Sequence, residues 1–266
     1  MASGIRKLRI KKGRGRMKDS KIIMLMVFVV MVWWFSGCGP VVVEEEADQN
    51  KAVRVWNCGV PGNNSQDLLN RLERDCLSLC PDVVVMMVGT NDFLSSTHCT
   101  SADVYARNLD SLVVRIMAKS RLIVLTILPV REHYLLTRHP KDFFPNGCEE
   151  KVLTANRIVK EVCARRGCWL VDMNFYYELL AGNGVDDLLR TPQNSGMTDG
   201  VHPTPGGYKV MALVVSYFMA EHGIAPRRLV CFGDSIMYGS YMVGAGGAGL
   251  DDETFPGYLG RLLNYE

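Results

Sequence analysis

Four short motifs in this sequence of 266 residues carry the residue types that acyl-transfer chemistry requires. They read Gly233-Asp234-Ser235-Ile236, Gly89-Thr90-Asn91-Asp92, Gly59-Val60-Pro61-Gly62-Asn63 and Asp199-Gly200-Val201-His202. A serine hydroxyl becomes nucleophilic when a neighbouring imidazole accepts its proton, and a carboxylate fixes the tautomer of that imidazole. Uncharged N–H donors, from an asparagine amide or from backbone that a glycine lets approach closely, stabilise the oxyanion that forms. The four motifs therefore predict an acyl-transfer site, if the fold brings them together.

Each motif alone also fits a purely structural role. Ser235 could cap the segment that follows it, and Asp199 with His202 could form a capping pair. Asn91 and Gly62 both suit turns. The prediction of a site therefore depends on all four motifs meeting at one place in the fold.

The elements that position the motifs alternate between strand and helix. Short apolar or β-branched runs predict strands over residues 52–58, 82–88, 122–128, 168–172 and 228–232. Amphipathic stretches predict helices over residues 65–79, 102–118, 149–166, 205–221 and 254–264, with a long loop over residues 131–148. Strands separated by helices indicate an α/β fold, a three-layer α/β/α sandwich with a five-stranded, mostly parallel sheet. Sites in such sheets form at the carboxyl ends of the strands, where the motifs stand.

Taken together, the four motifs resemble those of the GDSL, or SGNH, hydrolase family of esterases and lipases. The resemblance covers most of residues 52–266 and implies a flavodoxin-like fold without a metal or other cofactor. It also implies that Ser235 is the nucleophile, His202 the base and Asp199 its orienting carboxylate. The implied oxyanion hole combines the backbone N–H groups of Ser235 and Gly62 with the side-chain amide of Asn91.

The order of the motifs departs from the family pattern. In the family the Gly-Asp-Ser block comes first, whereas here it follows the Asp/His block. Starting the chain at Arg228 and joining Glu266 to Asp48 would restore the usual order, which indicates a circular permutation. A permuted single domain predicts that the strand at 228–232 lies between the strands at 52–58 and 82–88. The alternative is a broken tandem array, whose first copy would lack its central strand and its nucleophile.

A glycine-rich stretch over residues 244–249 also satisfies the pattern G-x-G-x-x-G of dinucleotide-binding folds. That fingerprint should directly follow a strand, open a helix and precede an acidic residue about 20 positions later. This stretch begins well beyond the predicted strand and lies near the end of the chain. We therefore expect a mobile loop that borders the site, without dinucleotide binding.

The N-terminus has the composition of a targeting segment. Residues 1–21 carry nine Lys and Arg residues, and the apolar run that follows, residues 22–35, would span roughly 21 Å as a helix, short of a bilayer core. A basic stretch, a short apolar run and small residues are typical of a secretory signal peptide. Residues 35–38 resemble a bacterial lipobox, so Cys38 is the predicted lipidation site and residues 39–51 a tether. An uncleaved signal anchor, and a true start at Met17, remain alternatives.

The charge of the chain is concentrated in its N-terminal segment. Without the nine basic residues and Asp19, the totals of 30 basic and 28 acidic residues become 21 and 27, a net charge of −6. An acidic body argues against nucleic acid as a partner.

Eight of the nine cysteines remain after Cys38, and in an exported chain they could form disulfides, for example between Cys99 and Cys148. Their spacing fits no zinc site.

These observations lead to one leading hypothesis and two alternatives. We expect an exported, membrane-anchored serine esterase that cleaves a carboxylic ester with a short acyl group, such as acetyl, on a glycan or lipid. An envelope O-acyltransferase of the same fold would use the same residues with a different acceptor. A catalytically silent surface lipoprotein is the third possibility, although the complete set of site residues argues against it. The oligomeric state does not follow from the sequence.

Overall fold

A computed structural model describes residues 52–182, 184 and 188–265 of the chain. The predictions about the targeting segment, Cys38 and the tether over residues 39–51 lie outside the described residues. None of the helices in the described part of the chain is long and apolar enough to cross a membrane.

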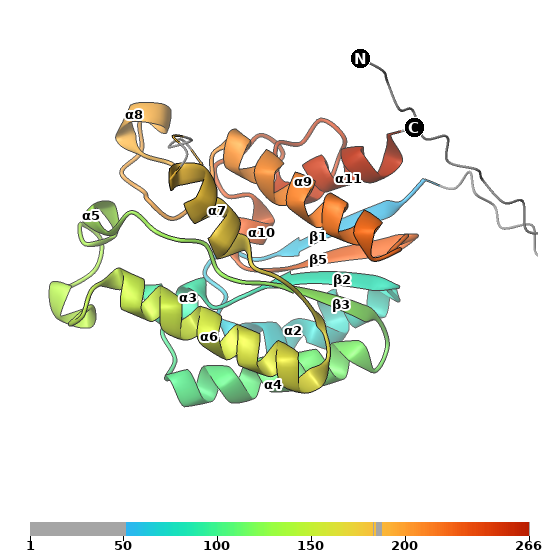
Figure 1. Cartoon of the computed structure of the whole chain (residues 1–266), viewed down its shortest axis with the longest axis horizontal. Helices are drawn as coiled ribbons and strands as arrows, with labels where there is room; N and C mark the ends of the chain where they lie inside the picture. Colours follow the sequence, from blue (N-terminus) through green and yellow to red (C-terminus); the bar gives the residue numbers. More distant parts are fainter. Residues whose placement is uncertain (1–51, 183, 185–187, 266) are drawn as a thin grey trace, which may run out of the picture. The chain divides into compact units, whose positions relative to one another are not determined.

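Five parallel strands form one sheet in the order β1-β5-β2-β3-β4 (Figure 1). They are β1 (Arg54–Gly59), β2 (Val83–Met87), β3 (Arg121–Leu125), β4 (Trp169–Val171) and β5 (Arg228–Gly233). The last strand in the sequence thus lies between the first two, with Phe232 opposite Cys58 on one side and Met86 on the other. The predicted parallel sheet and the predicted place of the strand at 228–232 are confirmed.

The composition of the central strands explains why they lie in the middle of the sheet. All five residues of β2 are buried, and so are the five residues of β5 that follow Arg228. Parallel strands covered by helices on both faces have no solvent-facing side, so their sequences are apolar throughout rather than alternating.

Helices cover both faces of the sheet and make the predicted three layers (Figure 1). One face carries α2 (Ser65–Asp75), α4 (Ala102–Met117) and α6 (Cys148–Arg166), and the other carries α7 (Met173–Gly182), α9 (Pro205–Glu221) and α11 (Phe255–Asn264). Four short helices stand in the connections, namely α3 (Thr90–Leu94), α5 (Glu132–Leu135), α8 (Pro192–Ser195) and α10 (Ser235–Tyr238). Of these, α3 and α10 begin at the predicted site motifs.

Some helix boundaries differ from the sequence prediction. The predicted helix over residues 65–79 ends at Asp75, and a 3₁₀ turn, η1 (Leu77–Leu79), replaces its last part. Cys80 adopts a left-handed conformation and precedes Pro81, so the chain must leave the helix here. The predicted loop over residues 131–148 contains α5 and the 3₁₀ turn η2 (Lys141–Phe143), and no helical pattern had indicated α7 or α8.

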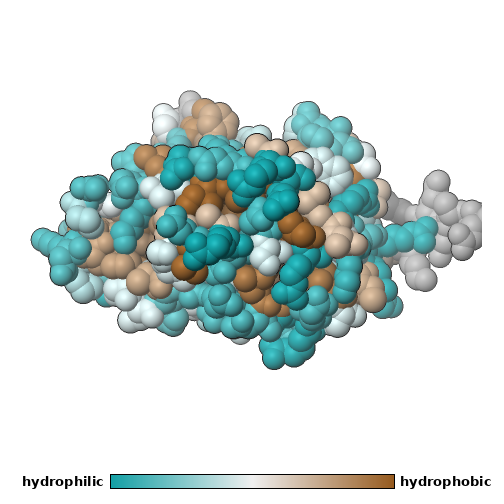
Figure 2. Space-filling model, turned by 90° about the horizontal axis from the view of Figure 1, so that it is seen from below, coloured by the Kyte–Doolittle hydropathy of each residue, from teal (hydrophilic) through white to brown (hydrophobic). Residues whose placement is uncertain are grey.

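Ion pairs cross the outer surface of the α2, α4 and α6 layer. Glu73 on α2 pairs with Arg115 at 3.0 Å and with Lys119 at 3.2 Å, while Arg166 on α6 pairs with Asp110 at 2.6 Å. Hydrophilic residues cover most of this face, and the hydrophobic ones lie between them in small groups (Figure 2). Exposed pairs of this kind contribute little stability each, about 0–1 kcal/mol.

The two ends of the described domain lie side by side. The side chain of Asn264, at the end of α11, accepts a hydrogen bond of 2.6 Å from the backbone N–H of Val53 and donates one of 3.1 Å to its carbonyl. Residues 211 positions apart in the sequence are therefore joined just before β1 begins.

All eight cysteines of the described residues carry free thiols. The pairing of Cys99 with Cys148 that the sequence allowed is not formed, since Cys99 is exposed in a loop and Cys148 is buried at the start of α6.

Candidate active site

Ser235 stands at a sharp strand-to-helix turn. The strand β5 ends at Gly233, and the Asp234 side chain caps α10 by accepting a hydrogen bond of 2.9 Å from the N–H of Ile236. A Cβ atom at Gly233 would lie 2.4 Å from the carbonyl oxygen of Met87 on β2, so only glycine lets the two strands approach here. The turn places the Ser235 hydroxyl at the carboxyl edge of the sheet.

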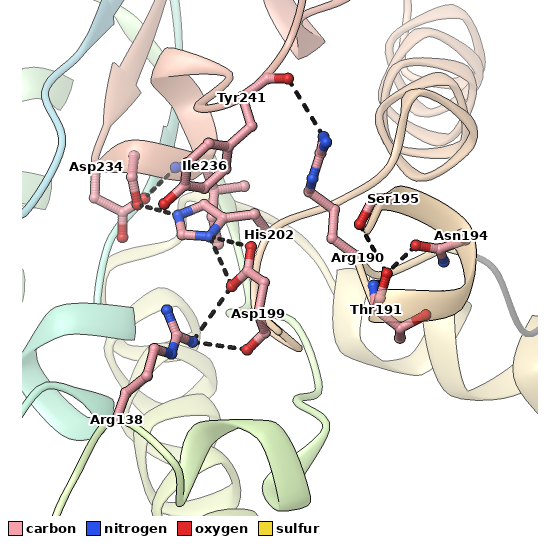
Figure 3. Close-up of polar contacts among 11 residues, drawn as sticks. Arg138, Arg190, Thr191, Asn194, Ser195, Asp199, His202, Asp234, Ile236 and Tyr241 are labelled. Carbon is pink, nitrogen blue, oxygen red and sulfur yellow. Dashed lines mark hydrogen bonds and ion pairs between the residues drawn. The ribbon is translucent and has the colours of Figure 1, made fainter. Parts of the chain in front are cut away.

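His202 connects Ser235 to Asp199. Its Nε2 atom lies 2.9 Å from Ser235 Oγ. Its Nδ1 atom lies 2.8 Å from Asp199 Oδ2 (Figure 3). Arg190 shapes the loop that carries this pair, because its backbone N–H donates to the carbonyl of His202 and its carbonyl accepts from the N–H of Gly200. The three side chains that the sequence analysis singled out thus form one hydrogen-bonded chain.

Arg138 binds Asp199, the residue that accepts the hydrogen bond from His202. Its Nη2 atom donates 2.7 Å to the Asp199 carbonyl and lies 3.3 Å from the carboxylate Oδ1 (Figure 3). Burial by itself would raise the pKa of Asp199, but the hydrogen bond and charge of His202, together with the charge of Arg138, hold that pKa below its ordinary value. Asp199 is therefore held as the carboxylate, the form that can accept the Nδ1 proton of His202. Arg138 stands in no motif, and the sequence analysis missed it.

The predicted oxyanion donors gather beside Ser235. Asn91 is in the first turn of α3 and donates one side-chain N–H, at 2.9 Å, to the carbonyl of Asn63, which leaves its second N–H available. Gly62 has φ +81°, a left-handed conformation that favours glycine. Among the described residues, the backbone N–H groups of Gly62 and Ser235 have no hydrogen-bond partner. These donors can serve an oxyanion without breaking an existing bond.

Asp92 fixes the position of its neighbour Asn91. Its buried carboxylate accepts hydrogen bonds from the backbone N–H and the hydroxyl of Ser65, at 2.9 and 2.6 Å, and from the Thr100 hydroxyl at 2.8 Å. Burial raises the pKa of Asp92, and the hydrogen bonds from Ser65 and Thr100 oppose that shift. The carboxylate thereby ties the start of α3 to the start of α2.

Arg71, on α2, joins two of the strand ends that carry the site. It donates from Nη1 to the Cys58 carbonyl at 2.9 Å and from Nε to the Asn63 side chain at 2.6 Å. Its Nη2 donates to the Gly233 carbonyl at 2.7 Å, and the guanidinium lies 4.5 Å from the centre of the Phe232 ring. Burial lowers the pKa of Arg71, but arginine stays charged in proteins. The guanidinium therefore sets how the Gly62 loop stands relative to Ser235.

An open cleft of about 290 Å³ exposes this chemistry to solvent. Ser235, His202, Asn91 and Gly62 line it, while Asp199 is buried behind His202. Within the described residues, no group of three or more His, Cys, Asp or Glu side chains could hold a metal ion.

The cleft also contains residues that the sequence analysis did not assign to it. His98 and His139, in the connections after α3 and α5, line the cleft together with Arg138, Ser240 and Tyr241. No local pattern distinguishes these side chains from others in loops. Their place depends on how the segment at 95–100 and the segment after β3 approach the end of the sheet.

The glycine-rich stretch over residues 244–249 has a defined conformation. Asn57 and Thr254 both donate to the carbonyl of Gly247, at 2.9 and 3.0 Å, and Gly249 donates to Asp252 at 2.6 Å. It neither follows a strand directly nor opens a helix. The expectation of a mobile loop is therefore replaced by a loop held in place by hydrogen bonds, and Tyr241, just before it, lines the cleft.

The fold and the residues of this cleft define a three-layer α/β/α domain with the motifs of GDSL, or SGNH, hydrolases. The sequence profile of the GDSL-like lipase/acylhydrolase family matches residues 36–210, more than half of the chain, and the protein belongs to this family. Membership of this family supports the assignment of the protein as a hydrolase. The match ends before β5, so it does not include Ser235.

Several individual proteins are also similar to this chain. An acetylxylan esterase of Geobacillus stearothermophilus is 26% identical over 174 residues, which cover 60% of this chain and 69% of that protein. Among solved structures, the lipase/acylhydrolase of Enterococcus faecalis has a TM-score of 0.49 at 20% identity, over 61% of this chain and 73% of that one. LAE5, an alpha/beta hydrolase from the metagenome of Lake Arreo, has a TM-score of 0.46 at 24% identity, over 61% and 69%.

Proposed function

We propose that this protein is a serine esterase that hydrolyses carboxylic esters through an acyl-enzyme. The observation that carries the proposal is the continuous chain of hydrogen bonds from Asp199 through His202 to Ser235 Oγ. The Ser235 end of this chain lies in an open cleft, beside backbone N–H groups that have no partner among the described residues. Membership of the lipase/acylhydrolase family supports it.

In the first half of the reaction, Ser235 Oγ attacks the ester carbonyl carbon while His202 Nε2 accepts the hydroxyl proton. The carbonyl oxygen becomes an oxyanion, which accepts hydrogen bonds from the N–H groups of Ser235 and Gly62 and from the amide of Asn91. The carbon–oxygen bond to the alcohol then breaks. His202 gives its proton to the departing alkoxide, and the acyl group remains on Ser235.

In the second half, water replaces the alcohol. His202 accepts a proton from water as its oxygen attacks the acyl carbon, and the collapse of the second oxyanion returns the proton to Ser235 Oγ. Asp199 stays ionised throughout, holds the Nδ1–H of His202 and stabilises the imidazolium.

The substrate is an ester with a short acyl group, such as acetyl. A cleft of about 290 Å³ is at the lower end of the range for ligand sites, about 300–1,000 Å³. The similarity to an acetylxylan esterase also favours a small acyl group on a carbohydrate. Transfer of the acyl group to an envelope polymer in place of water remains the second candidate, because the same residues would perform it.

The test is hydrolysis of p-nitrophenyl acetate, propionate and butyrate by the purified protein and by its Ser235→Ala variant. We expect turnover that decreases with acyl length and is lost in the variant. Products formed with a sugar acceptor distinguish transfer from hydrolysis. Lack of turnover by the wild-type protein on every ester would contradict the proposal.

We also infer that the chain is a circular permutant of the family pattern. Three observations support this: β5 lies between β1 and β2, the family match ends before β5, and Asn264 pairs with Val53 at the opposite end of the domain. A gene that starts at Arg228, joins the end of α11 to β1 and ends near Gly223 should yield a folded protein with wild-type activity. Failure of this rearranged chain to fold would contradict the inference.

Export is a separate proposal that rests on the basic and apolar pattern of the N-terminal residues. If Cys38 is lipidated, Cys38→Ser should release the protein from the membrane fraction or leave its precursor unprocessed. A mature protein that begins elsewhere and carries no lipid would contradict lipidation but not secretion.

A further inference from the structure

We infer that Tyr241 forms the subsite for the alcohol portion of the ester, and that this portion is a pyranose ring of an acylated carbohydrate. The inference rests on the proposed function, because it names the leaving alcohol of that reaction. It concerns a residue that stands in none of the four motifs.

Tyr241 combines a strained backbone with an exposed ring. Its φ of +69° is in the left-handed region, which is costly for an aromatic residue. The residue is 54% exposed although it lines the cleft. Strained residues persist where the surrounding structure holds them, and they cluster at ligand sites. A large exposed aromatic side chain held in a strained conformation beside the nucleophile is therefore a candidate for contact with substrate.

Arg190 holds Tyr241 in place. Its Nη1 atom donates 3.3 Å to the Tyr241 carbonyl, and its guanidinium lies 5.5 Å from the centre of the tyrosine ring (Figure 3). The backbone N–H of the same arginine donates 2.9 Å to the His202 carbonyl. One residue thus fixes both Tyr241 and His202, so the aromatic ring has a fixed place relative to the catalytic base.

The position of Tyr241 indicates which part of the ester it meets. Its ring centre lies 5.2 Å from that of His202, with the two rings nearly perpendicular at 88°. His202 must give its proton to the departing alkoxide, so the alcohol has to lie on the His202 side of Ser235. The oxyanion points to Asn91 and Gly62 instead. Tyr241 therefore borders the alcohol, not the carbonyl oxygen.

The chemistry around Tyr241 favours a sugar as that alcohol. The apolar C–H face of a pyranose packs against an aromatic ring, and its hydroxyl groups need hydrogen-bonding partners. Ser240, Arg138 and His139 line the same cleft and can supply them. A long aliphatic alcohol would displace water from these polar groups without replacing the hydrogen bonds that the water made. The side chains around His202 therefore offer an aromatic surface for the apolar face of a pyranose ring and polar groups for its hydroxyl-bearing edge.

The experiment compares two acetate esters that differ in the alcohol, ethyl acetate and a mono-O-acetylated methyl pyranoside whose other hydroxyl groups are free. The proteins are the wild type, Tyr241→Ala, Tyr241→Leu, Tyr241→Phe and a control, Tyr217→Ala, which removes an exposed ring on α9 that does not line the cleft. Circular dichroism checks that each variant is folded, and the leucine variant keeps side-chain bulk if the alanine variant does not fold.

We expect kcat/KM on the pyranoside ester to fall roughly tenfold in Tyr241→Ala and Tyr241→Leu, as for the loss of one aromatic packing contact. The loss on ethyl acetate should be several-fold smaller than the loss on the pyranoside ester in the same variants, since the alcohol of ethyl acetate is too small to cover the ring. Tyr217→Ala should match the wild type on both esters, and Tyr241→Phe, which keeps the ring, should lose less activity on the pyranoside ester than Tyr241→Leu does. Saturation-transfer NMR should show binding of the pyranoside ester to Ser235→Ala and its loss in Ser235→Ala/Tyr241→Leu.

Other results overturn the inference. Equal losses on both esters would show that Tyr241 acts through His202, and unchanged rates would show that it has no role. If the wild type cleaves ethyl acetate but not the pyranoside ester, the subsite is wrong while the esterase function stands. If it cleaves neither, the esterase function fails, and the subsite stands or falls on the NMR result alone.

Discussion

Arg71 Nη2 donates a hydrogen bond of 2.7 Å to the carbonyl oxygen of Gly233, a residue 162 positions later in the sequence. The same guanidinium holds the carbonyl of Cys58 at the end of β1. One side chain thus connects the loop of the predicted oxyanion donor Gly62 with the turn of Ser235, which come from distant parts of the chain.

Replacing Arg71 with Met should cost about 2–4 kcal/mol in the free energy of unfolding, because buried carbonyls lose their donor. Catalysis should also fall, since the oxyanion donors lose their fixed spacing. Urea unfolding and kcat/KM on p-nitrophenyl acetate measure the two effects. The control is Arg74→Met on the same helix, whose side chain is exposed. An unchanged unfolding midpoint for Arg71→Met would contradict the linking role.

Ser235→Ala and His202→Ala should each abolish most turnover, and the double variant should be no worse than the single ones. The two residues transfer one proton as a unit, so their losses do not add. We expect each loss in kcat to exceed about 10⁴-fold on an activated ester. If Ser235→Ala keeps more than about a tenth of wild-type activity, far above what loss of a nucleophile allows, the serine mechanism is wrong.

Asn91→Ala should retain the nucleophile but lose about 10²–10³ in kcat, as expected for one oxyanion donor. KM should change little, because the bond strengthens only as the negative charge develops. Asn70→Ala, at an exposed position on α2, is the matched control and should retain full activity. A rise in KM with unchanged kcat would instead place Asn91 in ground-state binding.

Arg138→Met should reduce activity more at acidic than at neutral pH. The charge of Arg138 helps to keep the pKa of Asp199 below its ordinary value, so its removal raises that pKa and leaves more Asp199 protonated as the pH falls. We expect a loss of about tenfold at pH 8 and a larger one at pH 5. Arg157→Met, which breaks an exposed pair with Glu161, serves as control. The same loss at both pH values would mean that Arg138 acts only through packing.

Asp234→Asn should change how stability depends on pH. Burial raises the pKa of Asp234 from 3.8 to about 6, opposed by its hydrogen bond from Ile236. The folded state therefore keeps a proton that the unfolded state releases, so this group's contribution is full below pH 3.8 and is lost as the pH rises through about 6.

The loss amounts to at most about 3 kcal/mol. The asparagine variant lacks it, so its stability relative to the wild type should improve between pH 4 and pH 7. Urea unfolding at several pH values measures this, with the exposed Asp251→Asn as control. A constant difference between variant and wild type across that range would contradict the raised pKa.

The sequence alone determined the strands, the layers and the predicted site motifs. A strand that is buried on both faces, such as β2, needs apolar side chains at every position. Because such a run is only a few residues long, it can be recognised in the sequence. The Ser235, His202, Asp199, Asn91 and Gly62 motifs were predicted to meet because carboxyl ends of parallel strands share one edge. The place of β5 between β1 and β2 was predicted from the resemblance to the GDSL family and the permuted order of its motifs.

Only the tertiary structure decided which other residues share the cleft and which hold it together. In the sequence, Arg71 looks like a surface arginine paired with Asp75 four residues later, yet it is buried against distant carbonyls. Arg138 and Tyr241 stand in segments without a periodic pattern. Their roles depend on contacts with residues 61 and 39 positions away, Asp199 and His202. The periodicity of apolar residues in a sequence predicts whether a segment is a helix or a strand. Contacts such as these depend instead on how separate loops pack at the end of the sheet.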